Sequence, residues 1–198
     1  MNDRIKFANK EKLLFLLLLN NKSLGRYKLS KLMGLSKARI RSLIQYYNKI
    51  DYTYSSKGRG GTRLTKKGLD VMCELNNLCS LDLNCDWLKV DEQILGVDMT
   101  YAVGFYITEY INTNGLDERD LAVREGAKGA LTLKKNGDQI MFANDEKITK
   151  LIKIKEEKES IDYNMIYIAF GESIESVLNA ISAVLLYHLE DKLIKYLN

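Results

Sequence analysis

Proline is absent from the sequence, and histidine occurs once, at His188. Catalytic Ser/His/Asp and Cys/His sets need a histidine among suitably placed partners, and we find no such set that His188 completes. A G-x4-GK-[ST] phosphate loop is also missing, and no G-x-G-x-x-G motif follows a predicted strand. The lack of proline reflects the overall amino-acid composition and indicates nothing about the function. We therefore expect no catalytic residue, no cofactor and a protein that is not an enzyme.

Cysteine is scarce too. Cys73, Cys79 and Cys85 follow one another at intervals of six residues. An odd number leaves no complete disulfide framework, and this spacing matches neither the C-x2-C of a zinc site nor a redox pair. His188 lies more than 100 residues further along the chain. We expect no metal site, and free thiols favour a reducing, cytoplasmic compartment.

Long hydrophobic runs are missing as well. The longest apolar run, residues 13–19, spans seven residues between charged and polar neighbours. A membrane-spanning helix needs about 20 apolar residues, and no small-residue cleavage site of a signal peptide follows the run. We expect no membrane partner. The run is predicted to be a core helix, from about residue 10 to 19, buried nearly all round.

The charge is divided unevenly along the chain. Residues 1–78 contain 17 Lys and Arg against 5 Asp and Glu, a balance of +12, whereas residues 79–198 have a balance of −8. A basic amino-terminal part joined to an acidic remainder indicates that the first part faces a polyanion. The acidic part would be repelled by DNA and is expected to hold a ligand, a partner or a dimer contact.

Residues 29–48 are typical of two short helices around a tight turn. Leu29, Leu32 and Met33 share one side of the first helix, Gly34 ends it, and Ser36 is suited to cap the second helix, residues 36–48. In the second helix an apolar inward stripe is formed by Ile40, Leu43, Ile44 and Tyr47.

A basic β-hairpin is predicted to follow. Residues 50–55 alternate as a strand, residues 57–61 form a glycine-rich turn with Lys57 and Arg59, and Arg63 begins the return strand. This order resembles a winged helix, and residues 64–69 (LTKKGL) are similar to the "L-T-x-x-G" junction after the wing in many winged-helix transcription factors. The resemblance covers about the first third of the chain. A helix over residues 65–78 is predicted to end this domain, and the candidates for its buried side are Leu69, Val71, Met72 and Leu75.

The resemblance implies binding to double-stranded DNA. The second helix would enter the major groove, and the wing would follow the sugar–phosphate backbone. The alternative is a structural helical hairpin with a solvated basic face. The candidate DNA-binding residues are Ser36, Lys37, Arg39, Arg41 and Gln45 on the helix, and Lys57, Arg59 and Arg63 on the wing.

The fold class expected is α+β, with a winged-helix domain at 1–78, a linker at 79–97 and a small α/β sandwich-like domain at 98–198 that ends in a long helix. In the last domain the pattern predicts a strand at 99–111, a helix at 116–125, a hairpin at 131–142 with its turn at Asn136-Gly137, a strand or short helix at 148–154, a strand at 165–170 and a helix at 174–196. Apolar residues cover the final helix broadly, so it packs within the chain or also on a second copy.

Residues 115–133 resemble the signature RD-x-A-x-x-x-GA-x-GA-x-T-L of archaeal proteins with an amino-terminal winged helix and a carboxy-terminal domain of unassigned function. Small residues at 126, 127, 129 and 130 would let backbone N–H groups approach an anionic effector, so Arg119, Asp120, Arg124 and Lys128 are candidate ligand residues. Neighbours on a helix point about 100° apart, so Arg119 and Asp120 are not expected to pair, and the acids Asp117 and Glu118 are expected on solvated surface. The alternative is that the arginine and aspartate brace local backbone.

The resemblance implies a sequence-specific transcription regulator of archaeal type, expected as a cytoplasmic homodimer with a small-molecule effector as a further partner. A different class stays open. A metabolic enzyme such as a small-molecule kinase can carry an appended winged helix, as an archaeal CTP-using riboflavin kinase does, although its nucleotide-binding pattern is not evident in residues 98–198.

Overall fold

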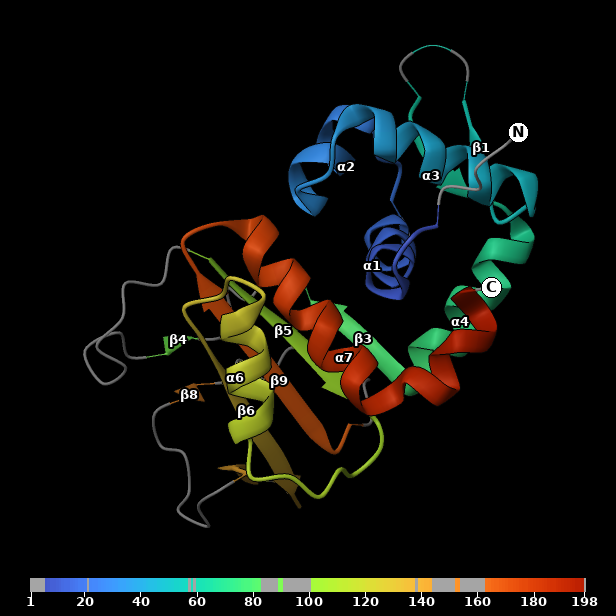
Figure 1. Cartoon of the computed structure of the whole chain (residues 1–198). Helices are drawn as coiled ribbons and strands as arrows, with labels where there is room; N and C mark the ends of the chain where they lie inside the picture. Colours follow the sequence, from blue (N-terminus) through green and yellow to red (C-terminus); the bar gives the residue numbers. More distant parts are fainter. Residues whose placement is uncertain are drawn as a thin grey trace. The chain divides into compact units, whose positions relative to one another are not determined.

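The computed structural model describes residues 6–20, 22–56, 58, 60–82, 89–90, 101–137, 139–143, 152–153 and 163–197. These residues form a mixed α/β protein with helices and antiparallel sheets (Figure 1). Contacts within the chain define two compact units. Unit 1 comprises Met1–Asn76 and Leu189–Asn198, and unit 2 comprises Asn77–His188.

The centre of unit 1 is α1 (Asn9–Leu19). Every residue from Leu13 to Leu19 is buried, which confirms the prediction of a core helix. Phe15 stacks on Tyr47 of α3 with ring centroids 5.0 Å apart, and the Tyr47 hydroxyl donates to the Lys12 carbonyl over 3.2 Å. The burial of α1 therefore explains the apolar run.

Two short helices follow as predicted. They are α2 (Arg26–Met33) and α3 (Lys37–Lys49), separated by Gly34, whose left-handed backbone (φ 65°) ends α2. Ser36 caps α3, because its hydroxyl accepts the Arg39 N–H over 3.2 Å. The inward stripe of α3 is buried as expected and consists of Ile40, Leu43, Ile44 and Tyr47.

A short antiparallel hairpin, β1 (Thr53–Ser55) and β2 (Thr62–Leu64), comes next. The first strand begins later than the pattern indicated, because α3 extends to Lys49 and Asp51 adopts a positive φ of 60°. Leu24 also pairs with Thr62, through two backbone hydrogen bonds, so the segment before α2 is attached to the hairpin.

The hairpin leads into α4 (Lys66–Leu78). Met72 and Leu75 are buried as expected, whereas Leu69 is 45% exposed. Gly68 takes the inner position instead, since a Cβ there would lie 2.1 Å from the Tyr52 carbonyl oxygen. The helix therefore turns its glycine, and not the neighbouring leucine, toward the hairpin.

The carboxy-terminal end of α7 (Ile174–Leu197) belongs to unit 1. Leu189, Leu193 and Leu197 are buried. The Tyr196 hydroxyl donates to Glu74 of α4 over 2.6 Å, and Asn9 of α1 donates to Glu190 over 3.2 Å. The predicted division into residues 1–78 and 98–198 does not include the end of α7 in the first domain. The apolar pattern along α7 does not show which residues elsewhere in the chain its side chains contact.

Unit 2 contains a five-stranded antiparallel sheet with the order β3-β5-β9-β6-β7. The expected linker at 79–97 is wrong for its first residues, since they form β3 and pair with β5. The strands are β3 (Cys79–Asp82), β5 (Tyr101–Ile107), β9 (Met165–Gly171), β6 (Gly129–Asn136) and β7 (Gln139–Phe142), and a separate pair joins β4 (Lys89–Val90) to β8 (Ile152–Lys153). The rest of the expected 148–154 element lies outside the described residues.

The predicted hairpin is present with a shifted turn. Asn136 is the last residue of β6 and pairs with Gln139, and the Gly137 that follows has a positive φ of 60°. Two helices cross the same face of the sheet, α6 (Leu116–Arg124) and the first turns of α7 (Figure 1). The apolar stripe of α7 is buried at most positions, and the large exposed hydrophobic side chains of this helix are those of Tyr187 and Ile194, which lie outside the stripe.

Candidate functional site

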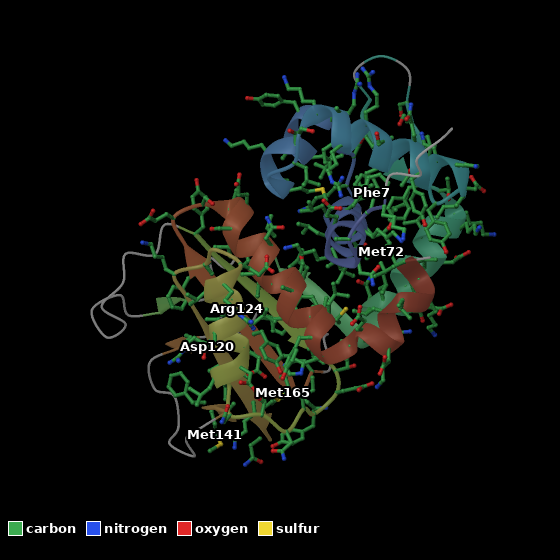
Figure 2. All side chains as sticks on the ribbon, viewed as in Figure 1. Phe7, Met72, Asp120, Arg124, Met141 and Met165 are labelled. Atoms are coloured by element: carbon green, nitrogen blue, oxygen red, sulfur yellow. The ribbon has the colours of Figure 1, made fainter. Side chains whose placement is uncertain are left out.

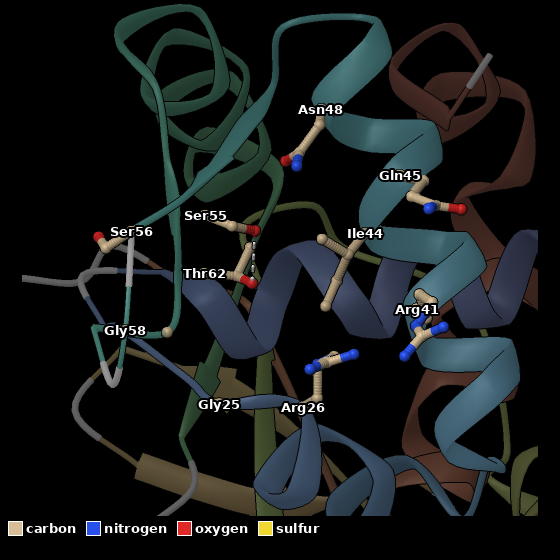
Figure 3. Close-up of a pocket in the computed structure, with 11 residues that line it drawn as sticks. Gly25, Arg26, Arg41, Ile44, Gln45, Asn48, Ser55, Ser56, Gly58 and Thr62 are labelled. Atoms are coloured by element: carbon tan, nitrogen blue, oxygen red, sulfur yellow. Dashed lines mark hydrogen bonds between the residues drawn. The ribbon is translucent and has the colours of Figure 1, made fainter.

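A cleft of about 520 Å³ opens on unit 1 between α3, the start of α2 and the hairpin (Figure 3). Arg41, Gln45 and Asn48 border it from α3, and Arg26 borders it from α2. None of the described residues that line it is a carboxylate. The remaining lining residues are Gly25, Ile44, Ser55, Ser56, Gly58, Gly61 and Thr62.

Helical spacing explains the polar face that α3 turns to the cleft. Arg41 and Gln45 are four residues apart, and Asn48 follows three later, so the three side chains project from one side of the helix. All three are exposed, while Ile44 between them is buried. No partner among the described residues engages the Arg41 guanidinium or the Gln45 amide. The face thus presents a free cation and an amide that both donates and accepts hydrogen bonds.

Three contacts hold the hairpin, one to α3 and two to the segment before α2. Thr53 donates to the Asn48 side chain over 2.6 Å, Leu24 pairs with Thr62, and Ser23 donates to the Gly60 carbonyl. Gly25, the residue before α2, provides no side-chain cap for that helix. The first N–H groups of α2 therefore lie beside Arg26 with no capping side chain, at the positive end of the helix dipole.

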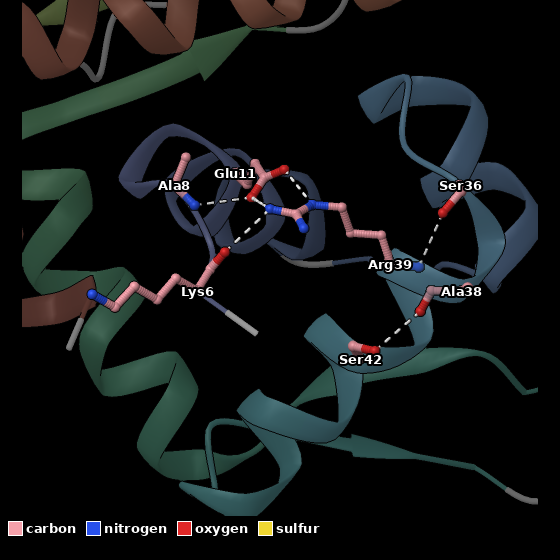
Figure 4. Close-up of polar contacts among 7 residues, drawn as sticks. All are labelled: Lys6, Ala8, Glu11, Ser36, Ala38, Arg39 and Ser42. Atoms are coloured by element: carbon pink, nitrogen blue, oxygen red, sulfur yellow. Dashed lines mark hydrogen bonds and ion pairs between the residues drawn. The ribbon is translucent and has the colours of Figure 1, made fainter. Parts of the chain in front are cut away.

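Arg39 has a different environment from Arg41, and Figure 4 shows the contacts of Arg39. Its guanidinium forms two 2.7 Å hydrogen bonds with both carboxylate oxygens of Glu11 in α1, and it donates to the Lys6 carbonyl over 3.3 Å. It also lies 5.3 Å from the centre of the Phe7 ring. Burial alone would raise the pKa of Glu11, but hydrogen bonds from Arg39 and the Ala8 N–H lower it below its usual value. Arg39 therefore fastens α3 to α1 and does not line the cleft.

The other predicted DNA-binding residues have varied positions. Ser36 is exposed and used as the α3 cap, and the Lys37 ammonium lies 5.4 Å from the centre of the Tyr27 ring, which is 72% exposed. Arg63 borders a second cleft of about 330 Å³ together with Lys22. Lys57 and Arg59 lie outside the described residues. Arg26, the first residue of α2, is a cation at the main cleft that was not among the residues predicted from the sequence.

The predicted ligand residues of unit 2 do not converge on one site. Contrary to expectation, Arg119 pairs with its neighbour Asp120 at 2.9 Å. Lys128 pairs with Glu172 at 2.9 Å. Both pairs are solvent-exposed, where ion pairs contribute little to stability. Asp120 and Arg124 project from the outer side of α6 (Figure 2).

A buried polar cluster lies instead beneath α6. The Glu118 carboxylate is fully buried, which corrects its assignment to solvated surface, and its Oε1 lies 2.8 Å from His188 Nε2 of α7. The Tyr167 ring on β9 lies 5.4 Å from the His188 ring. Burial, together with the Glu118 charge, raises the pKa of the Tyr167 hydroxyl. Sequence reasoning could not find this cluster, because its members are separated by up to 70 residues.

Among the described residues, no group of His, Cys, Asp and Glu side chains is arranged to hold a metal ion. Cys73 and Cys79 are both free thiols, the first exposed and the second buried, and burial raises the pKa of Cys79 to about 12. No helix in the described ranges combines the length and apolar character needed to cross a membrane.

Two comparisons with known proteins found matches, and one of them covers only the carboxy-terminal part of the chain. Residues 99–189 match the family model described as "Domain of unknown function (DUF4443)". A solved structure, a hypothetical protein from Pyrococcus horikoshii OT3, is 19% identical, with a TM-score of 0.78 over 97% of this chain and 98% of that one. The comparison with curated proteins found no match. Nearly the whole chain thus shares its fold with this archaeal protein.

Proposed function

We propose that the protein is a transcription regulator of archaeal type that binds double-stranded DNA sequence-specifically through a winged helix in unit 1. The observation that carries the proposal is the exposed polar face of α3, where Arg41 and Gln45 border a cleft with Arg26 and without a carboxylate. An α-helix fits the major groove of B-DNA, where arginine pairs with guanine and glutamine with adenine. Arg41 and Gln45 would read base edges.

The order of elements supports the same proposal. Three helices are followed by a two-stranded hairpin whose base is tied to α3 and to the segment before α2. In this arrangement the hairpin and the start of α2 would flank the reading helix and contact phosphates on either side. Arg26 and the uncapped N–H groups of α2 suit a phosphate oxygen. The +12 charge of residues 1–78 suits a polyanion as well.

The proposal is tested by footprinting the full chain on genomic DNA fragments, including its own promoter region, at two salt concentrations. We expect protected sites of defined sequence and a steep loss of affinity with added salt, because cations that neutralise phosphates release counterions. Uniform weak binding without a footprint would contradict sequence-specific regulation.

Three variants separate the contributions. Arg41→Ala or Gln45→Ala should relax the preference for the protected site, by about 1–3 kcal/mol for a base contact. Arg26→Ala should weaken binding to all sequences about equally and reduce the salt dependence. Arg124→Ala removes the same charge from the exposed surface of α6 and is the matched control. If Arg41→Ala and Gln45→Ala both keep the wild-type preference, α3 is not the reading helix.

We also propose that the protein acts as a homodimer in the cytoplasm. A symmetric regulator would protect two half-sites about one helical turn of DNA apart, and light scattering gives its mass in solution. The burial of most of the α7 stripe within one chain leaves little of that helix for a partner. A dimer contact is therefore expected on another surface.

A further inference from the structure

The helix α6 presents a carboxylate to the interior of unit 2. Of its nine residues, Glu118 and Ala122 are buried, while the apolar Leu116 and Val123 are 44% and 48% exposed. A surface helix normally turns an apolar stripe inward. A charged group in this position needs hydrogen-bond partners, since a buried carboxylate without them is costly.

Those partners are incomplete among the described residues. Glu118 uses Oε1 for His188, whereas its Oε2, the Tyr167 hydroxyl and the Thr132 hydroxyl are buried without a hydrogen-bond partner. Buried polar atoms are nearly always hydrogen-bonded in native proteins, so three such oxygens in one unit point to an additional group that they bind.

The three oxygens lie around the start of α6. Thr132 and Tyr167 are directly paired across β6 and β9, so their side chains share one face of the sheet. A Cβ at Gly115, where α6 begins, would lie 3.0 Å from Thr132 Cβ. The Glu118 charge acts on Tyr167, whose ring contacts the His188 ring. One region beneath α6 therefore contains all three oxygens.

We propose that this cluster is a binding site for a small molecule with N–H or O–H donors, such as an amine or a polyol, which binds between α6 and the sheet. A carboxylate oxygen only accepts hydrogen bonds, while the two hydroxyls accept or donate. The Glu118 carboxylate also repels anions, so the ligand chemistry differs from that of a phosphate or carboxylate effector. The proposal goes beyond DNA binding and does not depend on it.

A glycine flanks α6 at each end. Gly115 precedes the helix with φ 81°, and Gly126 follows it with φ 98°. Small residues at the ends of an element are frequent hinge positions. The ligand enters when α6 moves away from the sheet, and its donors bind Glu118 Oε2, Tyr167 and Thr132.

The test uses the full chain and three probes, namely 1,4-diaminobutane, inositol and the anion succinate. His188 is the only histidine in the sequence, so its imidazole C–H signals in a proton NMR spectrum need no assignment by mutation. We expect 1,4-diaminobutane or inositol to shift these signals saturably and to raise the thermal midpoint, and succinate to do neither.

Two conservative variants show whether the oxygens bind the probe. Tyr167→Phe and Thr132→Val each remove one unpaired hydroxyl while keeping shape, so the free protein should fold normally. Each substitution should lower the affinity for the probe about threefold to tenfold, as expected for the loss of one neutral hydrogen bond. Tyr187→Phe is the control, because Tyr187 also contacts the His188 ring but is 58% exposed.

The proposal is overturned if neither donor probe shifts the His188 signals, or if both variants bind the probe as the wild type does. It is also overturned if succinate is the probe that binds, which would favour the exposed cations of α6. No DNA is present in this assay, so its outcome is separate from that of the footprinting experiment.

Discussion

Arg39 and Arg41 lie two positions apart on α3, but only Arg39 has a carboxylate partner among the described residues. The side chain of Arg39 is 35% exposed and that of its partner Glu11 is 11% exposed. We expect Arg39→Ala to lower the free energy of unfolding by about 1–3 kcal/mol, because Glu11 keeps its charge and loses its main hydrogen-bond donor. Urea unfolding of the full chain measures this loss.

Arg41→Ala is the matched control for this comparison. Its guanidinium is exposed, so its removal should change the free energy of unfolding by no more than about 0.5 kcal/mol. The same substitution should weaken DNA binding, whereas Arg39→Ala should affect DNA binding mainly through stability. Equal stability losses in the two variants would contradict the structural role assigned to Arg39.

The lowered pKa of Glu11 gives the stability of unit 1 a pH dependence. Since the ionised form is favoured by folding, its contribution is fully present above the ordinary pKa of 4.5 and is lost as the pH falls through the lowered value. We expect Glu11→Gln to be less stable than the wild type at pH 7, with the difference shrinking below pH 4.5. Urea titrations at pH 7, 5 and 3 measure it. A constant difference across this range would rule out the linkage.

At the level of secondary-structure elements, local signals were sufficient for much of unit 1. Ser36 and Gly34 delimit α3 and α2 through cap geometry, and the apolar run of α1 identifies a buried helix. Predictions of side-chain environment were wrong where a contact with a residue distant in the sequence determines that environment. Arg39 belongs to the outer surface by helical spacing, but Glu11, 28 residues earlier, draws it to α1. In α4 the apolar spacing predicts that Leu69 is buried. Gly68 occupies the buried position instead, because the Tyr52 carbonyl lies too close for any side chain there.

The position of Gly68 makes α4 an exception to the usual effect of alanine in helices. Alanine normally stabilises a helix relative to glycine by about 0.8–1 kcal/mol. At this position its Cβ would lie 2.1 Å from the Tyr52 carbonyl oxygen, a backbone atom that has little freedom to move. We expect Gly68→Ala to destabilise the protein by about 1–3 kcal/mol. Thermal unfolding measures it, with Cys73→Ala on the exposed side of α4 as a near-neutral control.

At the scale of the whole molecule, most strands and helices of unit 2 could be predicted from the sequence. Which segments join the same sheet, and which side chains are buried against it, could not. An apolar run predicted β9, the Asn-Gly turn predicted the hairpin that contains β6, and acidic residues near its start predicted α6, since these signals are local. The place of Cys79–Asp82 in the sheet and the buried contacts of Glu118 depend on partners tens of residues away. In the candidate DNA-binding site, Arg41 and Gln45 were correctly placed on one exposed face, while Arg26 was missed.

The last turns of α7 complete the core of unit 1, so a lesion there should act on the part of the protein proposed to bind DNA. Leu193 is fully buried and Ile194, the next residue, is 39% exposed. We expect Leu193→Ala to lower the free energy of unfolding by about 2–5 kcal/mol, because it leaves a cavity. Ile194→Ala should lower it much less. Urea unfolding and DNA affinity are measured for both.

The same argument extends to fragments. A fragment of residues 1–78 lacks Leu193, Tyr196 and Leu197, and it also loses the hydrogen bond between Tyr196 and Glu74. We expect such a fragment to be mostly unfolded by circular dichroism, and mixing it with a peptide of residues 189–198 to restore helix only at high peptide concentration. A 1–78 fragment that is as stable as the full chain, together with a harmless Leu193→Ala, would mean that unit 1 folds independently of α7.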